Sequence, residues 1–359
     1  MSVSSSAVRP IRWAIVGSGG IARRTVGDLR LCPEARLVAI CSRSRERADA
    51  FAAEHGLPLA FDDYTALCAS PEVDAVYIGT PHATHFALAR QALVAGKHVL
   101  CEKPLTMTAD EARTLGRLAA EHGVLVMEAM WMKFSPAMQR AVELVREGVI
   151  GQPRFLQAGL GYPVPANGPA RFWDPALGGG ALYDMGVYLL TLAQMFLGEP
   201  EEVRVTGQMR PDGVDLAEAI TLRYAGGAMA QLATSIIGWM PPRGWLGGDG
   251  GAIDFQEPLF SPGGLKVSTG RPPAPPQVQQ LDFPREGAGY APMFRAAHQA
   301  IRAGQTEHPQ HPVAATAAVL DLMQRVQALM AVERDAGASA GLGAGSAPGA
   351  EASPPGARP

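Results

Sequence analysis

The sequence predicts two domains of different class: a doubly wound parallel α/β sheet, followed by an α+β domain. The sheet of the second domain is expected to be mostly antiparallel and open-faced, with helices on one side. Two observations predict this. Short apolar runs alternate with helical patterns from Ile11 to Ala129, and later strand-like runs follow one another without helices between them. Interleaved helices favour a parallel sheet, whereas successive strands favour an antiparallel one.

The first domain is predicted from five buried strands and the helices between them. Strands are expected at 11–16, 36–41, 74–79, 98–101 and 124–128. Helices are expected at about 20–31, 44–55, 83–95 and 108–122. The last of these opens with Thr108, followed three residues later by Glu111, which is the spacing of a capping box.

The second domain is predicted from helices and a series of strands. Helices are expected at 135–147, 181–196, 293–303 and 313–333, and a loop rich in Gly, Pro and aromatic residues spans 159–180. Strands are expected at 202–209, 217–224 and 228–237, with weaker ones at 265–268 and 278–283. The Gly- and Pro-rich stretch 238–292 indicates hairpins and loops.

Composition and charge exclude several kinds of partner. Hydrophobic residues make up 47% of the 359 residues, which suffices for a packed core, and the net charge of −3 is spread without long basic runs. Nucleic acid or a membrane surface as partner would need a basic patch. We expect no membrane span and no secretory signal. The four cysteines match neither a metal site nor a disulfide framework, so buried thiols and a cytoplasmic protein are expected.

A glycine motif follows the first strand and opens the first helix. It has the form G-x-G-x-x-A and comprises Gly17, Ser18, Gly19, Gly20, Ile21 and Ala22. In this pattern the first glycine makes the tight turn, the second lets the backbone approach a pyrophosphate, and the small last residue lets helix and sheet pack closely. The strand before it and the helix after it favour a Rossmann dinucleotide-binding domain over an ordinary glycine-rich turn.

The end of the second strand favours NADP over NAD, although NAD stays possible. A carboxylate about 20 positions past the motif would bind the ribose 2′-hydroxyl of NAD. Here Ser42, Arg43 and Arg45 stand instead, with no carboxylate before Glu46. A hydroxyl and a guanidinium suit a 2′-phosphate. The alternative is that the two arginines only solvate the start of a helix.

Two further clusters point to chemistry. Glu102-Lys103-Pro104 follows a strand at its carboxyl end, where ligands of open α/β sheets bind. Gly178-Gly179-Gly180 precedes a helix in which Asp184 and Tyr188 stand one turn apart on one face. Taken singly, the first could be a surface turn and the second a capped core helix.

Together these residues resemble the glucose–fructose oxidoreductase/inositol dehydrogenase (Gfo/Idh/MocA) family. The resemblance covers nearly the whole chain, from Ile11 to about Glu333. It rests on Gly79-Thr-Pro-His-Ala-Thr-His85, Glu102-Lys103-Pro104, Glu128-Ala-Met-Trp131, Arg171-Phe-Trp-Asp-Pro-Ala-Leu-Gly-Gly-Gly180 and Thr306-Glu-His-Pro309. Many members carry His four residues after the Asp. Tyr188 at that place resembles the branch of dimeric dihydrodiol dehydrogenases, D-xylose dehydrogenases and glucose–fructose oxidoreductase.

The resemblance implies roles for individual residues. Lys103 and Tyr188 would form an acid/base pair, in which the ammonium lowers the pKa of a phenol that ordinarily titrates near 10. Asp184 would hold Lys103 or a substrate hydroxyl. The nicotinamide pocket would be lined by Thr80, Pro81, His82, His85, Glu102 and Lys103, although either histidine could serve packing or capping instead. Arg171, Phe172 and Trp173 would line the substrate pocket together with Tyr188, unless the two aromatics are core residues.

The predicted function is hydride transfer between NADP and a secondary alcohol or the anomeric carbon of a sugar or cyclic diol, without a metal ion. The alternative is a non-catalytic NADP-binding regulator of the same family. Residues 11–130 would bind the cofactor, and 131–334 would bind substrate and form a homodimer or homotetramer through the second sheet. Residues 1–10 and 335–359 are expected to be disordered.

Overall fold

The first sheet is parallel and has six strands in the order β3-β2-β1-β4-β5-β6. The computed structural model describes residues 9–271 and 273–343. The strands of this sheet are β1 (Ile11–Val16), β2 (Ala35–Cys41), β3 (Leu59–Phe61), β4 (Ala75–Ile78), β5 (His98–Cys101) and β6 (Val126–Glu128). The order doubles back at β1, between β2 and β4, so the predicted doubly wound fold is confirmed.

Helices connect these strands and begin where the sequence offers a cap. They are α1 (Gly20–Arg30), α2 (Arg45–His55), α3 (Tyr64–Ala69), α4 (His85–Val94, after a 3₁₀ turn η1, His82–Thr84) and α5 (Ala109–His122). The predicted capping box of Thr108 and Glu111 is present, and Gly123 ends α5 in the left-handed conformation. The sequence prediction missed the short elements β3 and α3.

The second sheet has eight strands in the order β14-β13-β12-β11-β7-β10-β9-β8. They are β7 (Pro153–Gly161), β8 (Glu202–Met209), β9 (Asp215–Arg223), β10 (Met229–Ser235), β11 (Met240–Gly248), β12 (Gly251–Phe255), β13 (Gly264–Thr269) and β14 (Gln277–Asp282). All pairings are antiparallel except that of β10 with β7. The mostly antiparallel sheet is therefore confirmed. β7 was not predicted, and β11 and β12 form one of the hairpins that were expected in 238–292 without strand bounds.

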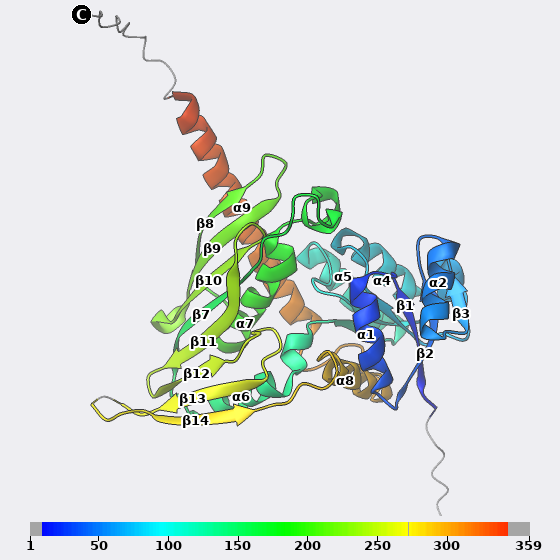
Figure 1. Cartoon of the computed structure of the whole chain (residues 1–359), viewed down its shortest axis with the longest axis horizontal. Coiled ribbons are helices and arrows are strands. Elements are labelled where there is room, and N and C mark those ends of the chain that lie inside the picture. The colour runs from blue at the N-terminus through cyan, green and yellow to red at the C-terminus, as the bar shows by residue number, and fades with distance from the viewer. Residues whose placement is uncertain (1–8, 272, 344–359) are drawn as a thin grey trace, which may run out of the picture.

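The helices of the second half of the chain lie on the side of this sheet that faces the first domain (Figure 1). The α-helices are α6 (Pro136–Arg146), α7 (Val187–Leu197), α8 (Ala291–Arg302) and α9 (Val313–Gly343). Short turns are η2 (Trp131–Phe134), η3 (Ala170–Phe172), η4 (Pro175–Leu177), η5 (Leu182–Gly186) and η6 (Ala225–Gly227). α9 packs against β8, α7 and α5, so it joins the two domains.

α8 follows the second sheet in sequence but packs against the first domain. Phe294 in α8 meets the rings of Trp13 and Tyr77, and the Nε1–H of Trp13 donates to His298 Nε2 over 2.9 Å. The predicted division at residue 130 had placed this helix with the second domain. Phe294 and His298 are buried, their ring contacts are with β1 and β4, and α8 also packs against α1.

The predicted disordered ends need correction. Arg9 lies in the predicted disordered segment 1–10, yet its guanidinium pairs with Asp74. The last helix was expected to end at Glu333, but α9 runs to Gly343. The predictions for residues 1–8 and 344–359 lie outside the described residues.

One helical stretch of the described chain, Pro175–Leu197, is long and apolar enough to cross a membrane, but 72% of its apolar window is buried inside the protein. It is the core helix of the second domain, which explains its composition.

Candidate active site

The glycine turn after β1 leaves room for a ligand backbone. Gly17 has φ +101°, and a Cβ there would lie 2.8 Å from the carbonyl oxygen of Gly79 at the end of β4. Only glycine fits such a position. A Cβ on Gly79 would in turn lie 3.1 Å from the Ile21 side chain, so the two strand ends approach closely. By contrast, a Cβ on Gly19 or Gly20 would meet nothing within 4 Å, which marks the open side of the turn.

The N-terminus of α1 is uncapped on that open side. Gly19 stands at the N-cap position without a side-chain hydrogen bond, and the first turn of α1 carries no acidic residue. Free N–H groups and the helix dipole favour a phosphate there. Ala22 is completely buried against the sheet, as the motif predicts. These features fit the pyrophosphate of a dinucleotide.

The end of β2 presents hydroxyls and one uncommitted arginine. Ser42 Oγ and Ser18 Oγ lie 2.9 Å apart, so the two predicted cofactor residues are side by side. Arg45 pairs with Asp49 on α2, whereas Arg43 is exposed and has no ion pair among the described residues. Arg43 is therefore the guanidinium that is free to meet a 2′-phosphate.

Lys103 leaves β5 and meets the π-helical turn η5. Its Nζ donates to the carbonyl oxygen of Asp184 and lies 3.3 Å from Asp184 Oδ1. In η5 the backbone bonds shift, and the N–H of Val187 donates to the carbonyl of Leu182, five residues back. The sequence predicted an ordinary helix here; π-turns are frequent at functional sites because they redirect backbone groups.

Asp184 is held between two cations. Its Oδ1 lies 2.7 Å from the Arg171 guanidinium and also faces Lys103. Burial alone would raise the pKa of Asp184, but the charges of Lys103 and Arg171 outweigh it and hold that pKa well below the usual range. Asp184 is therefore an anion at neutral pH, and the predicted contact of Asp184 with Lys103 is present.

Tyr188 meets Lys103 through its ring and not through its hydroxyl. Lys103 Nζ lies 4.8 Å from the ring centre, while the hydroxyl accepts a hydrogen bond of 2.7 Å from Trp131 Nε1. Burial, together with the Glu102 carboxylate, raises the pKa of Tyr188 above its usual value. The expectation that Lys103 lowers this pKa is wrong for this structure, because the ammonium faces the ring.

The residues predicted to line the nicotinamide pocket surround the same strand ends. His82 is buried, its Nδ1 lies 3.2 Å from the carbonyl oxygen of Gly178, and burial together with the Lys103 charge lowers its pKa to about 3. Both nitrogens of His85 face backbone carbonyls, those of Pro104 (2.8 Å) and Thr80 (2.9 Å). The ring of His85 therefore ties two chain segments together.

Glu102 is bound by groups of the protein itself. Its carboxylate is buried and accepts a hydrogen bond from the Tyr77 hydroxyl, and burial raises its pKa. The cofactor contact that the resemblance implied for Glu102 stays a prediction.

The three predicted substrate residues divide into different roles. Arg171 reaches Asp184 and stacks at 3.8 Å on the ring of Phe172, which is buried. Trp173 donates to the carbonyl of Pro165. Phe172 is thus a core residue, as the alternative reading had it, and Arg171 is the one of the three that contacts the Lys103–Asp184 group.

Sequence reasoning missed an aromatic group around the Tyr188 hydroxyl. Trp131 stacks on Tyr290 at 4.3 Å, and Phe260 lies 5.8 Å from Trp131 and 5.7 Å from Tyr188 between ring centres. Trp131 stands in a motif of the resemblance, so a signal for it existed. Phe260 and Tyr290 lie in the stretch rich in Gly and Pro, and no pattern singles them out.

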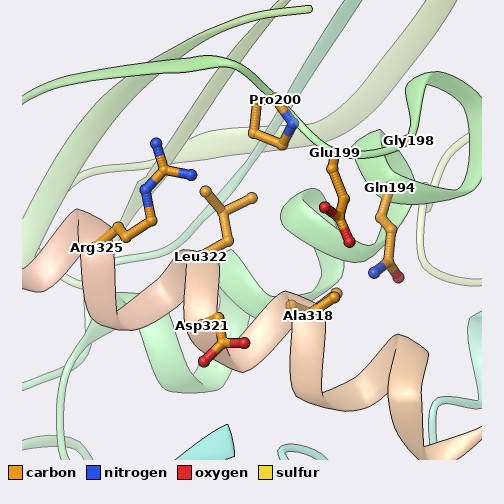
Figure 2. Close-up of a pocket in the computed structure, with 9 residues that line it drawn as sticks. Gln194, Gly198, Glu199, Pro200, Ala318, Asp321, Leu322 and Arg325 are labelled. Carbon is orange, nitrogen blue, oxygen red and sulfur yellow. The ribbon is translucent and has the colours of Figure 1, made fainter.

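The pocket in Figure 2 is a different site. It lies between the end of α7 and α9, and Gln194, Glu199, Asp321 and Arg325 are among its lining residues. None of them contacts the residues around Lys103. Asp321 is engaged by Arg113 of α5.

Comparison with known proteins covers most of the chain. A family model described as an oxidoreductase family with an NAD-binding Rossmann fold matches residues 11–130, and a model of the GFO/IDH/MocA C-terminal domain matches residues 138–254. Trans-1,2-dihydrobenzene-1,2-diol dehydrogenase of Mus musculus is 32% identical over 328 residues, which are 90% of this chain and 97% of that protein. The Homo sapiens protein of that name is 31% identical over 331 residues, 90% of this chain and 97% of its own.

Solved structures agree with this fold. KijD10, a 3-ketoreductase from Actinomadura kijaniata solved with NADP and TDP-benzene, matches with a TM-score of 0.78 and 30% identity, over 89% of this chain and 98% of its own. An aldose-aldose oxidoreductase from Caulobacter crescentus matches with a TM-score of 0.80 over 90% of this chain and 98% of its own. At 23% identity, that second likeness shows the fold alone.

Proposed function

Because this chain belongs to the Gfo/Idh/MocA oxidoreductase family and is a dehydrogenase acting on alcohol-type donors, we propose that it uses NADP and oxidises a cyclic diol or sugar, or reduces the corresponding ketone. The observation that carries this proposal is the meeting of Lys103, Asp184 and Tyr188 at the carboxyl ends of the parallel strands. Ligands of doubly wound sheets bind at that edge.

The preference for NADP rests on Ser42 and Arg43. No carboxylate stands at the end of β2 to accept hydrogen bonds from a 2′-hydroxyl, and Arg43 has no ion pair of its own among the described residues. A guanidinium gives a phosphate two parallel donors. The related ketoreductase was solved with NADP, which agrees with this assignment.

The nicotinamide, when bound, accepts or supplies the hydride. Tyr188 manages the proton on the substrate oxygen. Since its raised pKa keeps the phenol protonated at neutral pH, its hydroxyl is set to donate a proton to the oxygen of a ketone that is being reduced. In the direction of oxidation Tyr188 must receive that proton as a phenolate. The hydrogen bond from Trp131 stabilises the phenolate.

Lys103 and Asp184 hold the site in place. Lys103 is bound by both the carbonyl and the carboxylate of Asp184, and Arg171 fixes the same carboxylate from the other side. The ammonium supplies positive charge beside the ring of Tyr188, where an alkoxide develops during the reaction.

The experiment for this proposal is an assay of the purified protein with NADP⁺ and two sets of substrates. One set contains trans-dihydrodiols of benzene and naphthalene, the other contains aldoses. Reduction of NADP⁺ with either set supports the proposal and identifies the substrate class. Tight NADPH binding without turnover of any alcohol or sugar, in either direction, would instead favour the non-catalytic regulator.

We also propose that the chain forms a homodimer through the outer face of the second sheet. The described helices lie on the other face (Figure 1). Phe155 and Trp245 stack across β7 and β11 at 5.5 Å, Trp239 is 75% exposed and Val278 is 56% exposed. Exposed apolar side chains on an uncovered sheet favour association.

The four cysteines are free buried thiols, which agrees with a cytoplasmic location.

A further inference from the structure

A buried group of polar residues outside the hydride-transfer site links three parts of the chain. Lys133 Nζ, in η2, lies 3.2 Å from His311 Nδ1, and His311 Nε2 lies 2.6 Å from Glu128 Oε2 at the end of β6. Thr316 of α9 donates to the same carboxylate oxygen over 2.9 Å. Each of these four residues is less than 9% exposed. None of them takes part in the steps assigned to Lys103, Asp184 and Tyr188.

The pattern of donors fixes the charges of this group. A lysine ammonium only donates, so His311 Nδ1 must accept and its Nε2–H must donate to Glu128. The imidazole is then neutral, and burial together with the Lys133 charge lowers its pKa. Burial lowers the pKa of Lys133 to about 8, while hydrogen bonds from His311 and the backbone hold that of Glu128 below its usual value against burial. The positive charge of Lys133 and the negative charge of Glu128 are thus bridged by the neutral imidazole of His311.

The other carboxylate oxygen of Glu128 reaches the chain that carries Lys103. Glu128 Oε1 accepts a hydrogen bond of 2.9 Å from the backbone N–H of Leu105. β5 and β6 are paired with Cys101 opposite Glu128, so the carboxylate lies beside the end of β5. His85 Nδ1 is hydrogen-bonded to the carbonyl oxygen of Pro104. The turn 103–105 is therefore anchored at Pro104 by one histidine and at Leu105 by Glu128.

We propose that Lys133, His311 and Glu128 act as positioning residues, which fix the turn 103–105 and thereby aim the Lys103 ammonium at Asp184. This inference rests on the proposed function and names residues that determine the rate of that same site. A buried carboxylate without its partner takes up a proton or rearranges, because an unpaired buried charge is costly. Either change alters the bond to Leu105, two residues from Lys103.

The test compares His311→Leu with His311→Gln in the full-length protein. The leucine removes both hydrogen bonds, whereas the glutamine keeps an N–H that can donate to Glu128. We expect His311→Leu to lower kcat about tenfold or more while the Kd for NADPH changes less than about threefold, since a catalytic group displaced by an ångström can cost on the order of 100-fold. His311→Gln should recover most of the rate.

The matched control is His298→Gln, since His298 is also a buried histidine but bonds Trp13 and has no contact with the turn. It should lower the thermal midpoint without lowering kcat. Lys133→Met is the second variant, should His311→Leu not fold, and it should lower kcat in the same way. Values of kcat within twofold of wild type in the folded variants would overturn the proposal. A wild-type protein that turns over no substrate would overturn the proposed function and this inference together.

Discussion

Trp131 donates its indole N–H to the hydroxyl of Tyr188 over 2.7 Å, so the oxygen assigned to proton transfer has a protein partner before any substrate arrives. Lys103 lies over the ring of the same tyrosine and not at its oxygen. The two neighbours thus have different effects. Trp131 acts directly on the ionisation of the phenol, and Lys103 contributes charge and position near it.

Replacing Trp131 by Phe should slow oxidation more than reduction. The indole hydrogen bond favours the phenolate, so its loss raises further a pKa that burial already raises. Oxidation needs the deprotonated oxygen, and its pH–rate profile should shift upward by about one unit, as expected for one hydrogen bond to a charged group. Reduction uses the phenol and should change less than about threefold. Equal losses in both directions would contradict the role given to this bond.

Arg43→Ala should weaken NADP binding selectively. Loss of a guanidinium facing a phosphate removes charge-assisted hydrogen bonds, which are worth about 1.5–3 kcal/mol or roughly 10- to 100-fold in Kd. Binding of NAD should be unchanged. Arg45→Ala is the matched control, because Arg45 is already paired with Asp49. Titration by NADPH fluorescence measures all three proteins, and equal weakening by both substitutions would speak against the assignment.

Gly17→Ala should abolish cofactor binding. Its φ of +101° and the Gly79 carbonyl oxygen 2.8 Å from the added Cβ force the turn to move. Gly27→Ala serves as control, since Gly27 lies inside α1 with nothing within 4 Å of its added Cβ. That control should raise the free energy of unfolding by about 0.5–1 kcal/mol and leave binding intact. Retained binding in Gly17→Ala would show that the dinucleotide lies elsewhere.

Asp74→Asn should destabilise the protein at neutral pH but not in acid. Hydrogen bonds from Arg12 and Arg9 hold the pKa of Asp74 well below its usual value against burial. A depressed pKa contributes stability above the unfolded value of about 4, and this stability is lost as the pH falls toward the folded value. Thermal midpoints of wild type and variant should differ by roughly 2 °C at pH 7, since about 1 kcal/mol is involved. The difference should narrow progressively as the pH falls below about 4. A difference that widens as the pH falls below about 4 would contradict this sign.

Local sequence patterns were sufficient to bring together the residues that are proposed to hold the cofactor. Gly17, Gly19 and Ala22 act through the backbone of one turn, so their spacing alone predicts their geometry. Ser42 follows the next strand and meets Ser18 because parallel strands end at one edge. These contacts lie within one βαβ unit, in which residues that are close in the sequence are also close in space.

The group of Lys103, Asp184 and Tyr188 depends on contacts between residues far apart in the sequence, and no local pattern predicts such contacts. Lys103 and Asp184 are 81 positions apart, and Glu128 meets His311 across 183. The identities of Lys103 and Tyr188 could be proposed from a resemblance, but not that the ammonium meets the ring. Strand β7 and the bounds of strands β11 and β12 were not predicted for a related reason. Glycines and prolines interrupt the alternation of apolar residues in β11, and only pairing with both neighbours makes it a strand.

In the proposed reaction Tyr188 transfers the proton, while other residues hold the cofactor. Tyr188→Phe removes one oxygen, and the measurement is the rate of hydride transfer beside the Kd for NADPH. We predict that turnover with diols or aldoses falls by about 100-fold or more, the scale expected for loss of a general acid, while the Kd for NADPH changes less than about threefold. Turnover within a few-fold of wild type, with cofactor binding intact, would contradict the role of Tyr188 in proton transfer.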